Sequence, residues 1–365
     1  MTQLRGIYMI RKWNFDEAFL KEQIKEGKSR LQRMDKNSRQ AADIMSMIDT
    51  FEELLGIEKK HGIQKISLDK IIANLNYIIN NDLKLVKIDK WRELKAFCQY
   101  MPKYYYEKIN SSELPRSNES ILRTALSFYK SIDLNIYGAC KKILESDYKL
   151  VNFVPMKIFK KNKISSSFVF ECDHLDLPFI NISFYDDLKY LITVHELRHA
   201  ATYYLYGKNM RTLLGELPSI YSELLFTDKI NRHYDCGSLY NLRINDIGSN
   251  MNSITKYINI LERFSNCGNE LNRRNIYDVL RVSDNKQLLE MYKKLLRSPY
   301  LKCYDYFVST LVALELREYY YDGYNNKVNE TMEKIMLGSD IKLNYDRLAE
   351  RYIDHTNYVY SLSKK

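Results

Sequence analysis

Two histidines and a glutamate stand at a spacing that suits metal chemistry, within LITVHELRHAATYYLYG at residues 191–207. His195 and His199 are four residues apart, so on a helix they lie one turn apart on the same face. Both imidazoles can then reach one tetrahedral metal ion. Glu196 follows the first histidine, where it can take a proton from water at the open position of that metal. The spacing predicts a zinc site with a glutamate base.

The same motif also has a simpler interpretation. HExxH fixes three positions, and a chain of this length can contain it by chance. Both histidines would then be structural, packed on a helix and hydrogen-bonded to backbone groups.

A catalytic zinc usually has a third protein ligand in addition to the two histidines of an HExxH helix. Glu216 lies 21 residues after His195, and Glu223 lies seven residues further on. Seven residues are two helical turns, so both carboxylates share one helix face. One can bind the metal while the other accepts a hydrogen bond from the second ring nitrogen of a ligand histidine. Alternatively, both are ordinary solvated charges.

The elements around these residues are predicted to be mainly helical, because Gly and Pro are scarce, at 12 and 6 of 365 residues. Ser67, Ser120 and either Asp186 or Asp187 are expected to cap helices, and Gly207 is expected to end the HExxH helix. Pro218 suits the first turn of the next helix. Helical periods cover residues 14–60, 68–79, 91–105, 121–145 and 333–362.

Two strands are predicted directly before the HExxH helix, at residues 165–172 and 179–184. An extended peptide could pair with the edge of such a sheet and be held beside the metal by backbone hydrogen bonds. Equally, the strands could serve only to cover the core.

The composition favours a cytoplasmic protein. Six scattered cysteines contain no CxxC pair and indicate neither a disulfide framework nor a thiolate zinc site. No apolar run reaches membrane-spanning length, and the N-terminal residues lack the apolar core of a secretory signal. The net charge is +10, but no arginine-rich cluster indicates nucleic-acid binding, so neither a nucleic acid nor a membrane is expected as partner.

A polar break at residues 114–120 is the best candidate for a boundary between residues 1–113 and 114–365. The tyrosine run at residues 104–106 is expected to pack on a neighbouring helix rather than stack a ligand. Of the remaining histidines, His174 could face a cleft, whereas His61, His233 and His355 are expected at the surface.

Three stretches resemble the M3 metallopeptidase family, the group of thimet oligopeptidase and oligoendopeptidase F. Residues 178–200, from PFINI through TVHELRHA, look like that family's strand and zinc helix. GELPSIYSE at residues 215–223 is similar to its third-ligand segment. YDYFVSTLVALEL at residues 304–316 looks like its late tyrosine-bearing helix. Together with weaker similarity, the resemblance covers roughly the last two-thirds of the chain.

The resemblance implies a mainly α, gluzincin-type metallopeptidase fold with a small β-sheet next to the HExxH helix. It implies an N-terminal helical region at residues 1–113 and a catalytic domain at 114–365. Glu216 would be the third zinc ligand beside His195 and His199, and Glu223 would orient a histidine. Tyr306 is the first choice for the hydroxyl that stabilises the oxyanion, ahead of Tyr304 and Tyr300. The implied activity is a zinc-dependent endopeptidase, an oligopeptidase with peptide substrates and one Zn²⁺ ion.

The sequence departs from the family pattern at several positions. Arg198 replaces the usual glycine before the second histidine, which is expected to change the wall of the cleft. Thr202 stands where many members have another histidine, and Arg297 occupies the region of a histidine that usually precedes the late tyrosines.

These departures leave two other functions open. One is a dedicated zinc protease for a single protein substrate. The other is a binding or regulatory protein on an impaired peptidase scaffold. The presence of Glu196 counts against the second, because a binding protein has no chemical need for a general base.

Overall fold

The structure, a computed structural model, describes most of the chain. The described residues are 17–33, 44–45, 47–48, 51–52, 55, 67–100, 117–146, 151–155, 167–171, 177–184, 189–207, 214–230, 237–296, 299–336 and 343–363. The tyrosine run at 104–106, the boundary at 113/114, both aspartate caps, His61, His174, His233 and Arg297 lie outside these residues.

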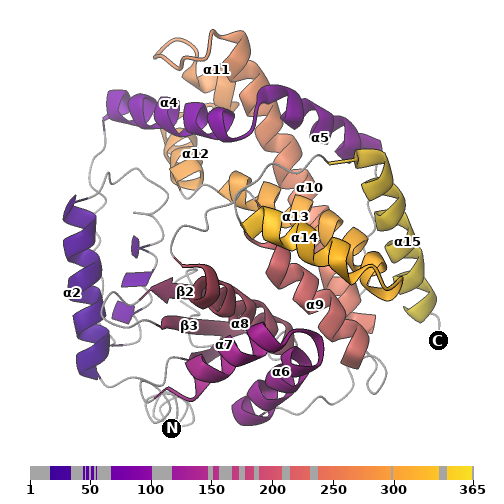
Figure 1. Ribbon diagram of the computed structural model, residues 1–365. Helices are drawn as coiled ribbons and strands as arrows, with labels where there is room; N and C mark the ends of the chain where they lie inside the picture. The colour runs from indigo at the N-terminus through magenta and orange to yellow at the C-terminus, as the bar shows by residue number, and fades with distance from the viewer. Residues whose placement is uncertain are drawn as a thin grey trace. The chain divides into compact units, whose positions relative to one another are not determined.

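Helices dominate these residues, which confirms the prediction of a mainly α chain with a small sheet beside the HExxH helix (Figure 1). The helices are α2 (Glu17–Arg33), α4 (Leu68–Leu85), α5 (Ile88–Tyr100), α6 (Asn118–Ile132), α7 (Leu134–Leu144), α8 (Lys189–Tyr206), α9 (Leu217–Ile230), α10 (Gly237–Asn266), α11 (Ile276–Leu280), α12 (Asn285–Leu296), α13 (Pro299–Tyr321), α14 (Asn325–Met336) and α15 (Tyr345–Ser363).

The chain divides into two compact units that alternate along the sequence. The first unit takes Met1–Gln23, Tyr104–Asn245 and Val308–Lys365, and the second takes Ile24–Lys103 and Asp246–Phe307. Three distant segments therefore build the first unit, which contains the whole HExxH helix.

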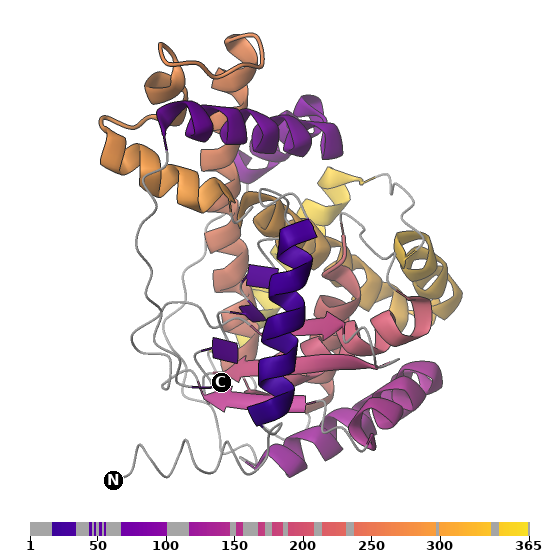
Figure 2. The same ribbon diagram turned by 90° about the vertical axis from the view of Figure 1, so that its left-hand side faces the viewer.

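A three-stranded sheet lies in the first unit, with the strands side by side in Figure 2. The strands are β1 (Val151–Pro155), β2 (Phe168–Glu171) and β3 (Pro178–Phe184), in the order β1-β3-β2. The predicted strands are confirmed as β2 and β3, which pair antiparallel with Phe168 opposite Asn181. β1 was not predicted, and it pairs parallel to β3 with Val151 opposite Ile180.

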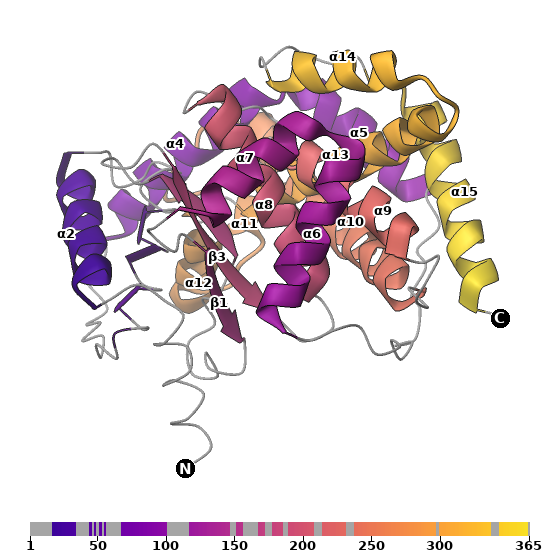
Figure 3. The same ribbon diagram turned by 60° about the horizontal axis from the view of Figure 1, so that its bottom comes forward.

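Helix α8 packs against the sheet and against α6, α7 and α9, as Figure 3 shows. Val194, Leu197, Ala200 and Ala201 are completely buried along it. A helix that is apolar on most of its faces must be covered on most sides, and this is the environment that α8 has. The HExxH residues consequently sit on a rigid, enclosed element.

Helix ends follow local chemistry. Ser67 caps α4 as predicted, because its Oγ accepts a hydrogen bond from the Lys70 amide at 3.3 Å. Gly207 ends α8 with φ of 80°, a conformation that suits glycine. The predicted cap Ser120 is wrong: α6 begins earlier, and Ser117 accepts the capping hydrogen bond from the Ser120 amide at 3.2 Å.

The second unit has its own core, in which the edges of aromatic rings meet the faces of others. Trp91 is completely buried, and its ring centroid lies 5.7 Å from that of Tyr257 and 4.9 Å from that of Tyr304. Asn74 donates a hydrogen bond to the Tyr292 hydroxyl at 2.7 Å, linking α4 to α12. This hydrogen bond pairs two side chains that both belong to the second unit.

Candidate metal centre

Two hydrogen bonds to backbone carbonyls hold α8 at the position of the first histidine. The Tyr129 hydroxyl of α6 donates to the Val194 carbonyl at 2.6 Å, and Ser219 Oγ of α9 donates to the His195 carbonyl at 3.1 Å. Tyr129 and Ser219 are completely buried. Tyr129 lies outside the sequence motifs, and Ser219 lies in the GELPSIYSE stretch without an expected role, so neither hydrogen bond was predicted. The two hydrogen bonds fix the position of the backbone from which the His195 side chain extends.

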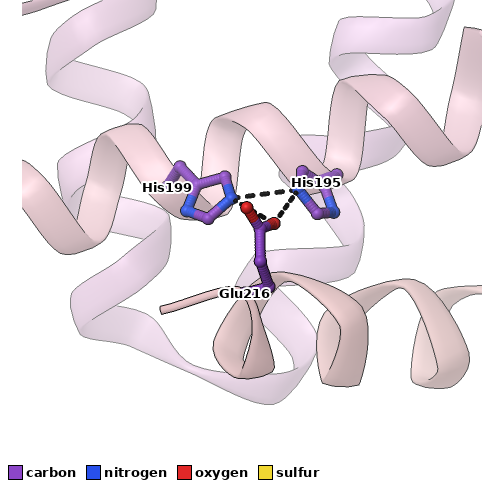
Figure 4. A group of neighbouring side chains, drawn as sticks. All are labelled: His195, His199 and Glu216. Carbon is purple, nitrogen blue, oxygen red and sulfur yellow. Dashed lines mark hydrogen bonds and ion pairs between the residues drawn. The ribbon is translucent and has the colours of Figure 1, made fainter. Parts of the chain in front are cut away.

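Three predicted ligand atoms converge in front of α8 (Figure 4). His195 Nε2 lies 2.9 Å from His199 Nε2 and 3.0 Å from Glu216 Oε2. His199 Nε2 lies 3.1 Å from the same glutamate oxygen. Within the described residues this is the one group of histidine, cysteine or acidic side chains arranged to hold a metal ion.

Glu216 reaches the histidines from the turn that leads into α9. Residues Leu214–Glu216 form this turn, and the Glu216 carbonyl accepts the Ile220 amide at 3.0 Å as the helix begins. Pro218 lies in the first helical turn, as predicted, where a missing amide hydrogen costs nothing.

Glu223 lies behind the first histidine. His195 Nδ1 donates to Glu223 Oε1 at 2.5 Å, and the carboxylate is 4% exposed. A proton held on Nδ1 leaves the lone pair of Nε2 directed at the other two ligand atoms. The structure thus brings Glu223 to the place that the resemblance implied.

The charge of Glu216 follows from its neighbours. Burial on its own would raise the pKa of this carboxyl, but His199 and His195 outweigh burial through charge and hydrogen bonding. Together they lower the pKa of Glu216 well below its ordinary value of 4.5. The carboxylate is therefore ionised at neutral pH, which is the form that binds a metal.

The arrangement fits a divalent cation better than it fits hydrogen bonds alone. Two imidazole nitrogens and a carboxylate oxygen meet at 2.9–3.1 Å, and one shared proton can satisfy only one of the three pairs. Atoms about 3 Å apart lie about 1.7 Å from the centre of their triangle. The three residues would therefore hold one ion at about 2.1 Å, the usual Zn–N and Zn–O distance.

The two predicted catalytic groups lie in different units. Glu196 is buried on α8, at 6% exposure, between the two histidines in sequence. Tyr306 is half-buried on α13, in the second unit, and Tyr304 is buried in the core of that unit. Glu196 therefore shares helix α8 with the two histidines, whereas Glu216 comes from the turn before α9.

Arg198 lines a cavity whose walls include none of the three ligand residues. Its guanidinium Nη1 lies 4.0 Å from Asp133 Oδ2, at the N-terminus of α7. Thr202, one turn further along α8, is 5% exposed, and its hydroxyl makes no hydrogen bond to other described residues. These contacts of Arg198 therefore do not support the predicted effect on a substrate cleft.

Of the comparisons with known proteins, the one with solved structures finds similarity, and the other two find none. No protein-family model matches the chain, and no curated protein is significantly similar to it. A protein assigned as a peptidase from Chlamydophila abortus is 12% identical, with a TM-score of 0.47 over 88% of this chain and 61% of that one.

Two further structures have values in the same range. A protein assigned as an oligoendopeptidase F from Bacillus anthracis is 13% identical, with a TM-score of 0.43 over 90% of this chain and 64% of that chain. PZ peptidase A, solved with an inhibitor, is 12% identical, with a TM-score of 0.42 over 89% and 65%. The chain spans about three-fifths of the length of these proteins.

Among the described helices, none is both long and apolar enough to cross a membrane.

Proposed function

We propose that this protein is a zinc-dependent endopeptidase that acts on oligopeptides, as the resemblance to the M3 family implies. The observation that carries the proposal is the convergence of His195 Nε2, His199 Nε2 and Glu216 Oε2 at 2.9–3.1 Å, beside a buried glutamate on the same helix. This combination of ligands, with a carboxylate base next to them, is typical of hydrolytic zinc sites.

Each residue has a separate task in this proposal. His195, His199 and Glu216 would hold the ion, and Glu223 keeps the proton of His195 on Nδ1. When bound, zinc supplies a Lewis acid that polarises a carbonyl group and lowers the pKa of water.

Glu196 takes a proton from the water that attacks the peptide carbonyl carbon, and delivers it to the nitrogen of the departing amine. The Tyr306 hydroxyl is proposed to donate a hydrogen bond to the oxyanion that forms at the carbonyl oxygen. Its replacement by phenylalanine tests this role apart from metal binding, because no proposed ligand changes.

The experiment measures zinc content and cleavage of a diverse peptide library for the wild-type protein and Glu196→Gln. We expect about one zinc per chain in both, and a loss of cleavage of about 10²-fold or more in the variant, because the base is removed while the ligands remain. Glu119→Gln is the matched control, since Glu119 is an exposed glutamate on α6 of the same unit.

Stoichiometric zinc without cleavage of the library by either protein would contradict the oligopeptidase and leave a dedicated protease or a binding protein on this scaffold. Substrate length separates the two enzymatic alternatives. An oligopeptidase cleaves short peptides and spares folded proteins, whereas a dedicated protease leaves the peptide library intact and cleaves one protein.

A further inference from the structure

A cavity of about 640 Å³ lies within the first unit, on a side of α8 that does not carry the metal ligands. Residues from α6, α7, α8, α9, α13 and α14 line it. Its volume is in the range of pockets that hold small organic ligands. The site concerned is therefore distinct from the candidate metal centre.

Arg198 supplies the positive charge of this cavity, and one nitrogen of its guanidinium is buried without a hydrogen-bond partner among the described residues. Its side chain is 11% exposed, and its Nε is buried with no acceptor among the described residues. The Asp133 carboxylate is 4.0 Å from Nη1, too far for a hydrogen bond. A buried N–H group without an acceptor is costly, so an acceptor from outside the protein would stabilise Arg198.

Asp133 is already engaged by the backbone. Its Oδ1 accepts hydrogen bonds from the amides of Asn135 at 2.9 Å and Ile136 at 3.1 Å, which caps α7. The geometry of the cap therefore holds this carboxylate in place, 4.0 Å from the guanidinium, and Nε of Arg198 can donate to another acceptor.

The charged residues that line the cavity restrict which kinds of ligand it can bind. One cation, Arg198, faces the cavity together with two carboxylates, Asp133 and Glu333. A dianion such as phosphate would meet net negative charge, whereas a ligand with both a carboxylate and an ammonium group can pair with both signs.

The remaining wall suits an organic side chain. Tyr206, Tyr221 and Tyr320 are among the residues that line the cavity, and aromatic side chains contact aromatic and aliphatic groups well. Burial raises the pKa of Tyr221, so its hydroxyl stays protonated and can donate a hydrogen bond.

We propose that this cavity is a second binding site for a zwitterionic amino acid or dipeptide, whose carboxylate pairs with Arg198 and whose ammonium group pairs with Asp133 or Glu333. The proposal does not depend on catalysis, because no predicted metal ligand or base lines the cavity.

The test measures binding of glycyl-phenylalanine by calorimetry, with the purified protein before and after chelator treatment. We expect the same affinity in both samples, because the site uses no metal. The C-terminal amide and the N-acetyl form of the dipeptide each remove one charge, and each should bind more weakly, the amide by about ten-fold or more. Free glycyl-phenylalanine and free phenylalanine distinguish a dipeptide from an amino acid as the preferred ligand.

Variants assign the binding to the cavity. Arg198→Gln should weaken binding by about ten-fold or more, and Arg198→Lys should weaken it less, because it keeps the charge and loses the planar fork. Glu333→Gln changes an exposed residue of the wall on α14 and should also weaken binding without affecting α8, because it removes one of the two carboxylates available to the ammonium group. Arg123→Gln removes one exposed positive charge on α6 outside the cavity and should leave binding unchanged.

Three results would overturn the proposal. They are the absence of dipeptide binding at millimolar concentration, unchanged binding by both Arg198→Gln and Glu333→Gln, and loss of binding when the metal is removed. The last result would place the dipeptide at the metal centre instead. Each of these three measurements can be made on a protein that has no peptidase activity. The proposed function and the proposed binding site can therefore fail independently of each other.

Discussion

At the scale of single residues, the site depends on which nitrogen of each histidine carries a proton. The contact between His195 Nδ1 and Glu223 fixes that proton on the far side of the ring from the other ligands. A histidine held in this way can bind a cation without first changing its tautomer. Glu223 thus contributes to metal affinity although it is not one of the three converging ligands.

Glu223→Gln tests this contribution. The amide keeps the size of the side chain and loses its negative charge, so the hydrogen bond to His195 weakens. Zinc affinity should fall by about 10–100-fold, measured by competition with a chelator of known affinity. Glu262→Gln, which changes a partly buried glutamate paired with Lys95, should retain wild-type affinity. Equal affinities for the two variants would remove Glu223 from the metal centre.

His355 is a residue for which the sequence prediction was wrong, because it is 3% exposed rather than on the surface. Burial lowers its pKa from 6.5 to about 3, assisted by the charge of Arg317 and opposed by Asp228. Its neighbours in sequence give no sign of burial, since the tail is polar and other elements provide the covering side chains.

The shifted pKa of His355 predicts a dependence of stability on pH. Between pH 6.5 and about 3 the unfolded chain binds a proton at this histidine and the folded chain does not. Folding stability from this group is therefore fully present above pH 6.5 and falls as the pH is lowered, by at most about 1.4 kcal/mol per pH unit. The difference in unfolding free energy between wild type and His355→Asn should shrink below pH 6.5. A constant difference from pH 7 to 4 would contradict this assignment.

At the scale of elements, α8 is placed by partners that come from several parts of the first unit. Spacing on a single helix was sufficient to pair His195 with His199, since helical geometry determines it. The third ligand comes from another element, and its choice over Glu223 needed the family resemblance. The direction of Arg198 was beyond either source, because it depends on α6, α7 and α14 surrounding the helix.

The sheet shows a similar limit. Residues 165–172 and 179–184 alternate in character and were predictable, and they pair as neighbours along the chain. β1 has only five residues and pairs in parallel with β3, so the residues opposite each other are 29 apart. A parallel partner so distant leaves no local turn signal in the sequence.

Tyr129→Phe tests how far α8 depends on its support. The change removes the buried hydrogen bond to the Val194 carbonyl and keeps the ring that packs against Phe128 and its neighbours. We expect a loss of about 1–2 kcal/mol of unfolding free energy in denaturant titrations. Tyr77→Phe removes an exposed hydroxyl and should cost almost nothing, since Tyr77 is 48% exposed. Equal losses for the two variants would show that the carbonyl contact does not stabilise the helix.

At the scale of the whole molecule, metal binding and folding should be linked. The proposed ligands come together only when α8 and the turn before α9 are in place, so zinc would bind the folded chain in preference to the unfolded one. Stability should then depend on the concentration of free zinc.

Removal of the metal by a chelator should lower the melting temperature by several degrees. At a free zinc concentration about 100 times the Kd, binding stabilises the folded chain by about 2.7 kcal/mol. His199→Gln should melt at the same temperature with and without chelator. A chelator-dependent shift of the same size in wild type and His199→Gln would place the stabilising metal elsewhere.

The alternation of the two units along the chain also affects how the protein is made. The side chain of Asp228 on α9 is 9% exposed. It accepts two hydrogen bonds, at 2.6 and 2.8 Å, from Arg317, which lies 89 residues later in the chain. When a ribosome has released the chain as far as Ile230, every proposed ligand has been synthesised, but the partner of this buried carboxylate has not. At about 5–20 residues per second, the wait for Arg317 is on the order of ten seconds. During that interval the nascent chain carries the HExxH motif without the last segment of its unit.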